Sequence, residues 1–111
     1  MNYYIVIPSH NEEKYIAQTL QSIIEQTVLP KKVVVVDDHS TDKTASIAQA
    51  FADKNPWITI VTKSSEAIHL PGSKVIQAFQ KGLETLDEEY DFIVKADADL
   101  IFPSNYFETI I

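Results

Sequence analysis

The residues with the clearest chemical potential in this 111-residue sequence are Asp97 and Asp99, which interrupt an apolar stretch. In an extended chain, residues i and i+2 project to the same side, so these two carboxylates would converge just beyond a strand end. Mg²⁺ and Mn²⁺ prefer oxygen ligands and share their coordination between one or two carboxylates and substrate phosphates. The Asp-x-Asp pair therefore predicts a divalent-metal site.

A solvated turn is the alternative for this pair, because aspartate is common in turns and the chain is rich in acids. The neighbouring residues favour the metal site. Apolar triplets lie on both sides of the pair, at 92–94 and at 100–102. Two charges among such neighbours would be costly without a partner, and we expect that partner to be a cation.

Two further polar segments follow apolar runs in the same abrupt way. Ser9–Glu12 follows a run rich in β-branched residues, and Asp37–Ser40 follows four successive valines. Asp38 is well placed to accept a hydrogen bond from an N–H group of a ligand. Asp37 is explained equally well by a role in orienting the turn at Ser40.

Only two glycines, Gly72 and Gly82, occur in the chain. Loops that cradle phosphates need several glycines, so neither a P-loop nor a dinucleotide fingerprint is present. Lys74 can reach a phosphate from the start of a helix, with a solvated position on the helix face as the alternative. Because no glycine-rich loop is present to hold phosphate groups, we expect an anionic ligand to need a cation as a bridge to the chain.

The elements that position these segments are predicted from hydrophobic periodicity. Strands are predicted at Tyr3–Ile7, Val33–Val36, Trp57–Val61 and Phe92–Val94. Helices are predicted between them: a first with Asn11 as N-cap and Glu12 and Glu13 in its first turn, a second capped by Ser40 or Thr41, and a third from Gly72 to Leu86.

The resulting order, β-α-β-α-β-α-β, predicts an α/β fold with a mostly parallel sheet and right-handed crossovers. Parallel strands bring every strand-to-helix loop to the same edge of the sheet, and α/β folds bind their ligands at that edge. The three polar segments should meet there.

Composition narrows the class of protein. With 9 basic and 16 acidic side chains the formal charge is −7, which argues against a nucleic-acid partner because such surfaces depend on Lys and Arg. The chain has no cysteine, no basic region typical of a signal peptide and no apolar run near the ~20 residues of a membrane span. We expect a cytoplasmic location, with membrane association of a longer protein left open.

Three motifs together resemble the inverting nucleotide-sugar glycosyltransferases of family 2, which have the GT-A fold. They are IVIPSHNEE at 5–13, VVVDDHSTD at 34–42 and DAD at 97–99, in the order and spacing of that family. The resemblance covers essentially the whole chain. It implies that residues 1–111 form the Rossmann-like, nucleotide-sugar-binding part of a glycosyltransferase domain, without the acceptor-binding part.

The resemblance also assigns roles to individual residues. Those that bind the nucleotide are Pro8, Ser9, Asn11, Glu12, Asp38, Lys74 and Asp97. Pro8, Ser9 and Glu12 would line the nucleoside pocket, and Asp38 would meet the base. Asp97 would approach the ribose or the metal, and Asp99 would hold the Mn²⁺ or Mg²⁺ that bridges the diphosphate of the donor.

The implied activity is metal-assisted transfer of a sugar from a nucleoside-diphosphate donor, a UDP-sugar before others, to an acceptor hydroxyl. The sequence does not identify the acceptor, and a glycan or a lipid-linked glycan is one candidate class. In this family a carboxylate beyond the Asp-x-Asp strand deprotonates the acceptor. The chain stops at Ile111, so no catalytic residue is assigned and the isolated chain is expected to be inactive.

A phospho-accepting receiver domain, which is a signalling module, is the alternative interpretation because its acidic pair also follows a run of valines. In a receiver that pair follows the first strand, whereas a whole β-α unit precedes Asp37 and Asp38 here. The interval from Asp38 to Asp97 is also longer than receivers use. A sugar nucleotidyltransferase would need a glycine-rich first loop, which Pro8–Asn11 is not.

Overall fold

The computed structural model describes residues 2–63 and 86–110, which form one sheet with helices packed against it. The strands are β1 (Tyr3–Ser9), β2 (Lys32–Asp38), β3 (Ile58–Lys63) and β4 (Phe92–Lys95), and the helices are α1 (Ile16–Ile24), α2 (Thr44–Lys54) and α4 (Tyr106–Ile110). The four predicted strands are confirmed, and each extends further at its C-terminal end than expected. The predicted third helix lies outside the described residues, Lys74 included, except for its last residue, Leu86, which is not helical. No helix in the described part is long and apolar enough to cross a membrane.

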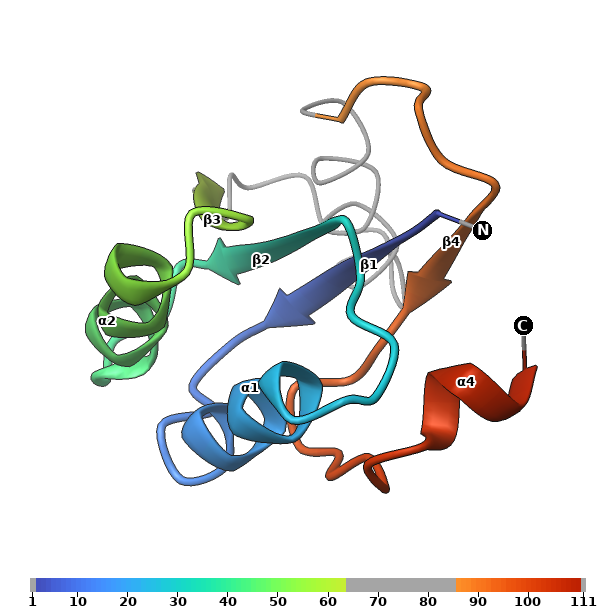
Figure 1. The fold of residues 1–111 in the computed structure, drawn as a ribbon. Coiled ribbons are helices and arrows are strands. Elements are labelled where there is room, and N and C mark those ends of the chain that lie inside the picture. The colour runs from blue at the N-terminus through green and yellow to red at the C-terminus, as the bar shows by residue number, and fades with distance from the viewer. Residues whose placement is uncertain (1, 64–85, 111) are drawn as a thin grey trace, which may run out of the picture.

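The four strands are all parallel and lie in the order β3-β2-β1-β4 (Figure 1). This arrangement confirms the predicted parallel α/β sheet. Strands β1 to β3 are added outward in one direction, and the chain then crosses back so that β4 pairs with the other side of β1. The strand order therefore reverses between β1 and β4, and open α/β sheets bind ligands at such a switch point.

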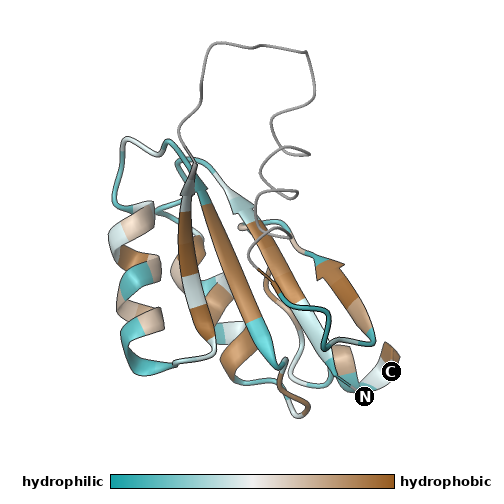
Figure 2. Cartoon of the chain, turned by 90° about the horizontal axis from the view of Figure 1, so that it is seen from above, coloured by the Kyte–Doolittle hydropathy of each residue, from teal (hydrophilic) through white to brown (hydrophobic). Residues whose placement is uncertain are grey.

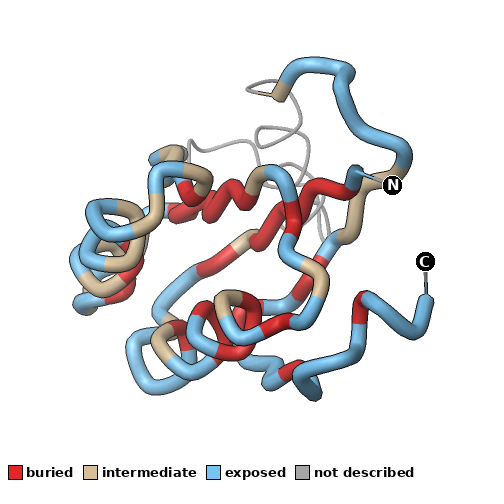
Figure 3. The backbone as a smooth tube through the Cα atoms, viewed as in Figure 1, coloured by how far each residue is buried: buried red, intermediate tan, exposed pale blue. Residues whose placement is uncertain are grey.

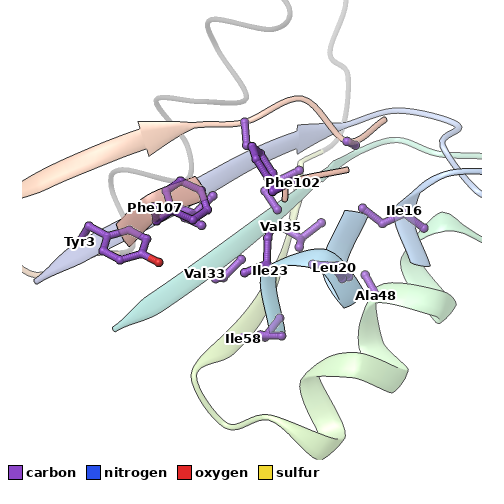
Figure 4. Packing of buried hydrophobic residues seen from close by; sticks show 14 residues of the cluster. Tyr3, Ile16, Leu20, Ile23, Val33, Val35, Ala48, Ile58, Phe102 and Phe107 are labelled. Carbon is purple, nitrogen blue, oxygen red and sulfur yellow. The ribbon is translucent and has the colours of Figure 1, made fainter. Parts of the chain in front are cut away.

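The core lies on both faces of β1 and β2, which are buried along almost their whole length (Figure 3). The four residues of Val33–Val36 are at most 1% exposed, as expected for a strand that is covered on both faces. On one face Val33 and Val35 join a cluster that includes Leu20 of α1 and Phe107 of α4 (Figure 4). Figure 2 shows the apolar residues concentrated along these strands.

Both helices α1 and α2 begin later than the sequence predicts. Asn11 is not an N-cap, because its φ of 52° places it in the left-handed region and α1 begins only at Ile16. Ser40 and Thr41 do not cap α2 either, since that helix begins at Thr44. The polar side chains that were expected to cap the first turns of these helices can therefore make other contacts.

A polar cluster closes the amino end of the sheet. Asp87 accepts hydrogen bonds from the Lys32 ammonium and from the Tyr4 hydroxyl, and the Glu89 N–H donates to Asp87 Oδ1 at 3.0 Å. The bond from Lys32, followed by the one from Tyr4, holds the pKa of Asp87 well below its usual range. This cluster lies at the end of the sheet opposite to the polar loops and attaches residues 86–91 to β1 and β2.

We expect the free energy of unfolding to depend less on pH in the acidic range in Asp87→Asn than in the wild type. A carboxylate with a lowered folded-state pKa stabilises the fold above its ordinary pKa of 3.8, and that contribution is lost as the pH falls below this value. In urea unfolding at neutral pH and at about pH 3, the wild type should lose more stability than Asp87→Asn between the two conditions. Glu88→Gln removes the same charge from an exposed neighbour and should behave like the wild type. Equal losses in the wild type and Asp87→Asn would contradict this role.

Candidate functional site

The carboxyl ends of β1, β2 and β4 meet at one edge of the sheet, as the order of elements predicts. Ser9 lies opposite Asp37 where β1 pairs with β2. On the other side of β1, the Ala96 N–H donates to the Val6 carbonyl at 3.0 Å, just past the end of β4. The three polar segments therefore leave the sheet from neighbouring strands.

Hydrogen bonds join the loop after β1 to the loop after β2. Asn11 Oδ1 accepts from the Thr41 N–H at 2.8 Å, and the Asn11 N–H donates to Ser40 Oγ at 3.0 Å. The Glu12 N–H donates to Thr44 Oγ1 at 2.8 Å. These bonds explain the positive φ of Asn11, because they turn its backbone toward the second loop.

His10 makes a further connection that the sequence reasoning missed. Its Nδ1 lies 2.6 Å from the Asp38 carbonyl oxygen and donates to it, since a carbonyl can only accept. Its place inside the first motif was the available signal for a role at the site. His39, by contrast, is exposed, with a φ of 53°.

Asp42 holds the start of α2 against the first loop. Its carboxylate accepts from the Thr44 N–H at 2.9 Å and from the Glu13 N–H at 3.2 Å. Burial alone would raise the pKa of Asp42, but the hydrogen bonds from Thr44 and Glu13 outweigh it and lower the pKa. Asp42 thus remains a charged acceptor that links the two loops.

Two acids at the end of β2 are buried. Asp37 is 5% exposed and Asp38 is 7% exposed. Within the described part of the chain, Asp37 Oδ1 has no hydrogen-bond partner, so this atom does not orient the Ser40 turn. Burying a carboxylate oxygen without a donor is costly, and this arrangement suits an N–H group supplied by a ligand.

Asp97 and Asp99 are both exposed, whereas Ala96 and Ala98 are 1% and 4% exposed. The alternation places both carboxylates on the solvent side. The chain is not extended there, however, because the Leu100 N–H donates to the Asp97 carbonyl at 3.4 Å and closes a turn. Both side chains reach solvent, so the cost of charge that the sequence predicts from the apolar neighbours is not seen for Asp97 and Asp99.

Glu12 connects the acidic pair to the first loop electrostatically. Burial raises the pKa of Glu12, and the negative charges of Asp99, Asp42 and Asp97 raise it further against the opposing effect of His10. The loops after β1, β2 and β4 also leave neighbouring parallel strands at one edge of the sheet. The loops therefore form one acidic edge, which we define by Glu12, Asp37, Asp38, Asp97 and Asp99.

A cation lies near this acidic edge within the chain itself. Lys95 Nζ is 3.6 Å from Asp97 Oδ1, and both side chains are exposed. Exposed pairs of this kind contribute little to stability. Lys95 contributes one positive charge beside the two carboxylates of Asp97 and Asp99.

The donor atoms of the acidic edge fit a hard divalent cation shared with a ligand. Among residues 2–63 and 86–110, no three His, Asp or Glu side chains form a complete protein cage for a metal ion. Mg²⁺ is usually bound through one or two carboxylates together with phosphates and water. Asp97 and Asp99 can supply that pair of carboxylates.

Known proteins of similar sequence are glycosyltransferases. Glycosyltransferase GlyG of Streptococcus pneumoniae serotype 4 (strain ATCC BAA-334 / TIGR4) is 28% identical over 106 residues, which are 96% of this chain and 33% of GlyG. A sequence model of the family described as Glycosyl transferase family 2 matches residues 4–111.

Two solved structures have a similar fold. S. aureus TarS 1-349 in complex with UDP has a TM-score of 0.76 and 25% identity, over 99% of this chain and 31% of that chain. The mannosyltransferase PcManGT from Pyrobaculum calidifontis, in complex with GDP-Man and Mn²⁺, has a TM-score of 0.68 and 27% identity, over 92% of this chain and 28% of that chain.

The chain spans about a third of the length of these relatives. The family match nevertheless covers nearly all of its residues, and the parallel sheet agrees with the GT-A glycosyltransferase structures. These findings set the receiver-domain interpretation aside, and the chain belongs to glycosyltransferase family 2.

Proposed function

We propose that this chain binds the nucleoside-diphosphate part of a sugar donor at the acidic edge, together with a divalent cation. The observation that carries the proposal is that β2, β1 and β4 are parallel neighbours in the sheet, so that the segments of Glu12, of the buried Asp37 and Asp38, and of the exposed Asp97 and Asp99 follow strand ends on one edge. The UDP in the TarS structure and the GDP-Man and Mn²⁺ in the PcManGT structure support it. UDP is the preferred nucleotide of the proposal, and Mn²⁺ or Mg²⁺ is the cation.

The nucleoside would lie over the ends of β1 and β2. Pro8 and Ser9 would line its pocket, and Asp38 would accept an N–H of the base. Asp37 is a second candidate acceptor through its buried Oδ1. Asn11 would act through the geometry of the loops, because its side-chain oxygen is already bonded to the Thr41 N–H.

The diphosphate would lie near the end of β4. A chain of charge −7 and an anionic diphosphate repel each other unless a cation lies between them. Asp97 and Asp99 would hold that cation through their carboxylate oxygens. When bound, Mn²⁺ or Mg²⁺ neutralises charge on the departing diphosphate.

The proposed reaction is transfer of the donor sugar to an acceptor hydroxyl, with a glycan or a lipid-linked glycan as the acceptor class. Direct displacement requires a base that deprotonates this hydroxyl. The proposal assigns the acids of the edge to the nucleotide or the cation. No residue of the chain is therefore assigned as the base, and residues 1–111 are proposed as the donor-binding part.

UDP should bind this chain only when Mn²⁺ or Mg²⁺ is present. Titration calorimetry with either metal and with EDTA measures the affinity directly. Uridine is the control ligand, because it lacks the diphosphate and its binding should not respond to the metal. Equal affinity for UDP with metal and with EDTA would contradict the cation bridge.

Asp99→Asn should weaken metal-dependent UDP binding by about tenfold or more, because the amide keeps the shape but loses the charge that a hard cation needs. The thermal midpoint without ligand should stay the same or rise, since grouped like charges cost stability. Asp53→Asn makes the same change of charge on α2 and should bind UDP like the wild type. Full retention of binding by Asp99→Asn would remove Asp99 from the cation site.

The purified 111-residue chain should bind donor but transfer no sugar at a rate typical of an enzyme of this family. The absence of a general base typically costs 10²–10⁴-fold, and an absent acceptor site removes positioning as well. The test incubates the chain with Mn²⁺, radiolabelled UDP-sugars and a panel of glycan acceptors. Robust formation of a glycoside would show that a residue of this chain serves as the base, and Glu12, Asp37 and Glu66 would be the first residues to mutate.

A further inference from the structure

A row of buried polar side chains on and just after α1 has no part in the proposed function as stated so far. Thr19, Ser22 and Gln26 are at most 6% exposed. Their spacings of three and four residues place them on one side of the helix. Buried polar groups are nearly always hydrogen-bonded, and each of these three has a partner in the segment that follows β4.

Ser22 and Gln26 hold the distal part of that segment. Ser22 Oγ accepts from the Phe102 N–H at 3.1 Å. Gln26 Nε2 donates to the Pro103 carbonyl at 2.6 Å, and Gln26 Oε1 accepts from the Phe107 N–H at 3.2 Å. These bonds attach α4 and the chain before it to α1.

Thr19 makes the contact nearest to the acidic pair. Its Oγ1 donates to the Ala98 carbonyl at 2.9 Å, and the two residues are 0% and 4% exposed. Ala98 lies between Asp97 and Asp99, so this bond fixes the part of the backbone that carries both carboxylates. Removing the hydroxyl would leave a buried carbonyl without a partner, which costs more than an ordinary hydrogen bond contributes.

The same helix also holds Glu12. The Glu12 carbonyl accepts from the Ile16 N–H at 2.8 Å, at the first residue of α1. Thr19 follows Ile16 by three residues, which is less than one helical turn. One rigid element therefore sets the position of Glu12 relative to that of Asp97 and Asp99.

We propose that Thr19 is a positioning residue for the divalent cation, because its hydroxyl holds the Ala98 peptide so that Asp97 and Asp99 face a shared ion. This inference rests on the proposed function, which supplies the cation. It predicts that a hydroxyl at position 19 matters for metal affinity beyond what it contributes to stability. Ser22 and Gln26 hold the segment further on and serve only its attachment.

The test compares Thr19→Val, which keeps the side-chain shape without the hydroxyl, with Thr19→Ser, which keeps the hydroxyl. The dissociation constant of UDP is measured over a range of Mn²⁺ concentrations and in EDTA, and uridine binding is measured without metal. In Thr19→Val the apparent affinity for Mn²⁺ should fall about tenfold, as is usual when a group that orients metal ligands is lost. Thr19→Ser should restore it, and uridine binding should not change in either variant.

Gln26→Leu is the matched control for stability, because it also removes the partner of two backbone groups, the part-buried Pro103 carbonyl and the buried Phe107 N–H. It should lower the thermal midpoint to a similar extent while keeping the Mn²⁺ affinity of the wild type. If Thr19→Val does not fold, Thr19→Ala takes its place in the comparison with Thr19→Ser. If folded Thr19→Val, or Thr19→Ala in its place, binds Mn²⁺ as tightly as the wild type, the inference about Thr19 is wrong and the proposed function is unaffected. Metal-independent UDP binding by the wild type would overturn the proposed function, and the inference with it.

Discussion

Parallel pairing on both sides of β1 is the constraint on which the acidic edge depends. Because β2 and β4 run in the same direction as β1, the loops after all three strands open to one edge. Tyr3–Ile7 are completely buried, so this strand cannot shift without exposing the centre of the core. The strand order reverses beside it, and this reversal brings the loop of Glu12 next to the loop of Asp97 and Asp99.

Two sets of hydrogen bonds then fix the neighbouring loops to the one that follows β1. Asn11 bonds to the loop after β2 and His10 to the last residue of β2, each about 30 residues away in the chain, and Thr19 of α1 bonds to Ala98, 79 residues away. The partners in both sets are mainly backbone groups and neutral side chains. These bonds position the backbone that carries Asp97 and Asp99 without using their carboxylate oxygens. A binding site whose ligand-contacting groups are positioned in this way is preorganised.

The sequence predicts the strands and the three polar segments well, because valine runs and abrupt changes in polarity are local signals. The alternation of strands and helices also predicts that the strands are parallel. Prediction from the sequence fails where one polar side chain could bond equally well to a nearby helix end or to a segment far away in the chain. Asn11 and Ser40 have the side chains of helix caps, yet they bond to each other's loops instead. Thr19 gives no local sign of its partner, and α4 is too short to predict from periodicity.

The two ends of the sheet use the same residue types with opposite results. At the amino end, Asp87 faces Lys32 and Tyr4, so its charge is compensated within the chain. At the carboxyl edge several acids gather beside Lys95, and the pKa of Glu12 rises because burial and nearby negative charges both disfavour its ionised form. Like charges gathered at a sheet edge cost stability, and such a cost is typical of sites whose missing partner is a ligand. A cation that binds there only in the folded state raises the free energy of unfolding through mass action. Binding would therefore offset the stability that the like charges of the acidic edge cost.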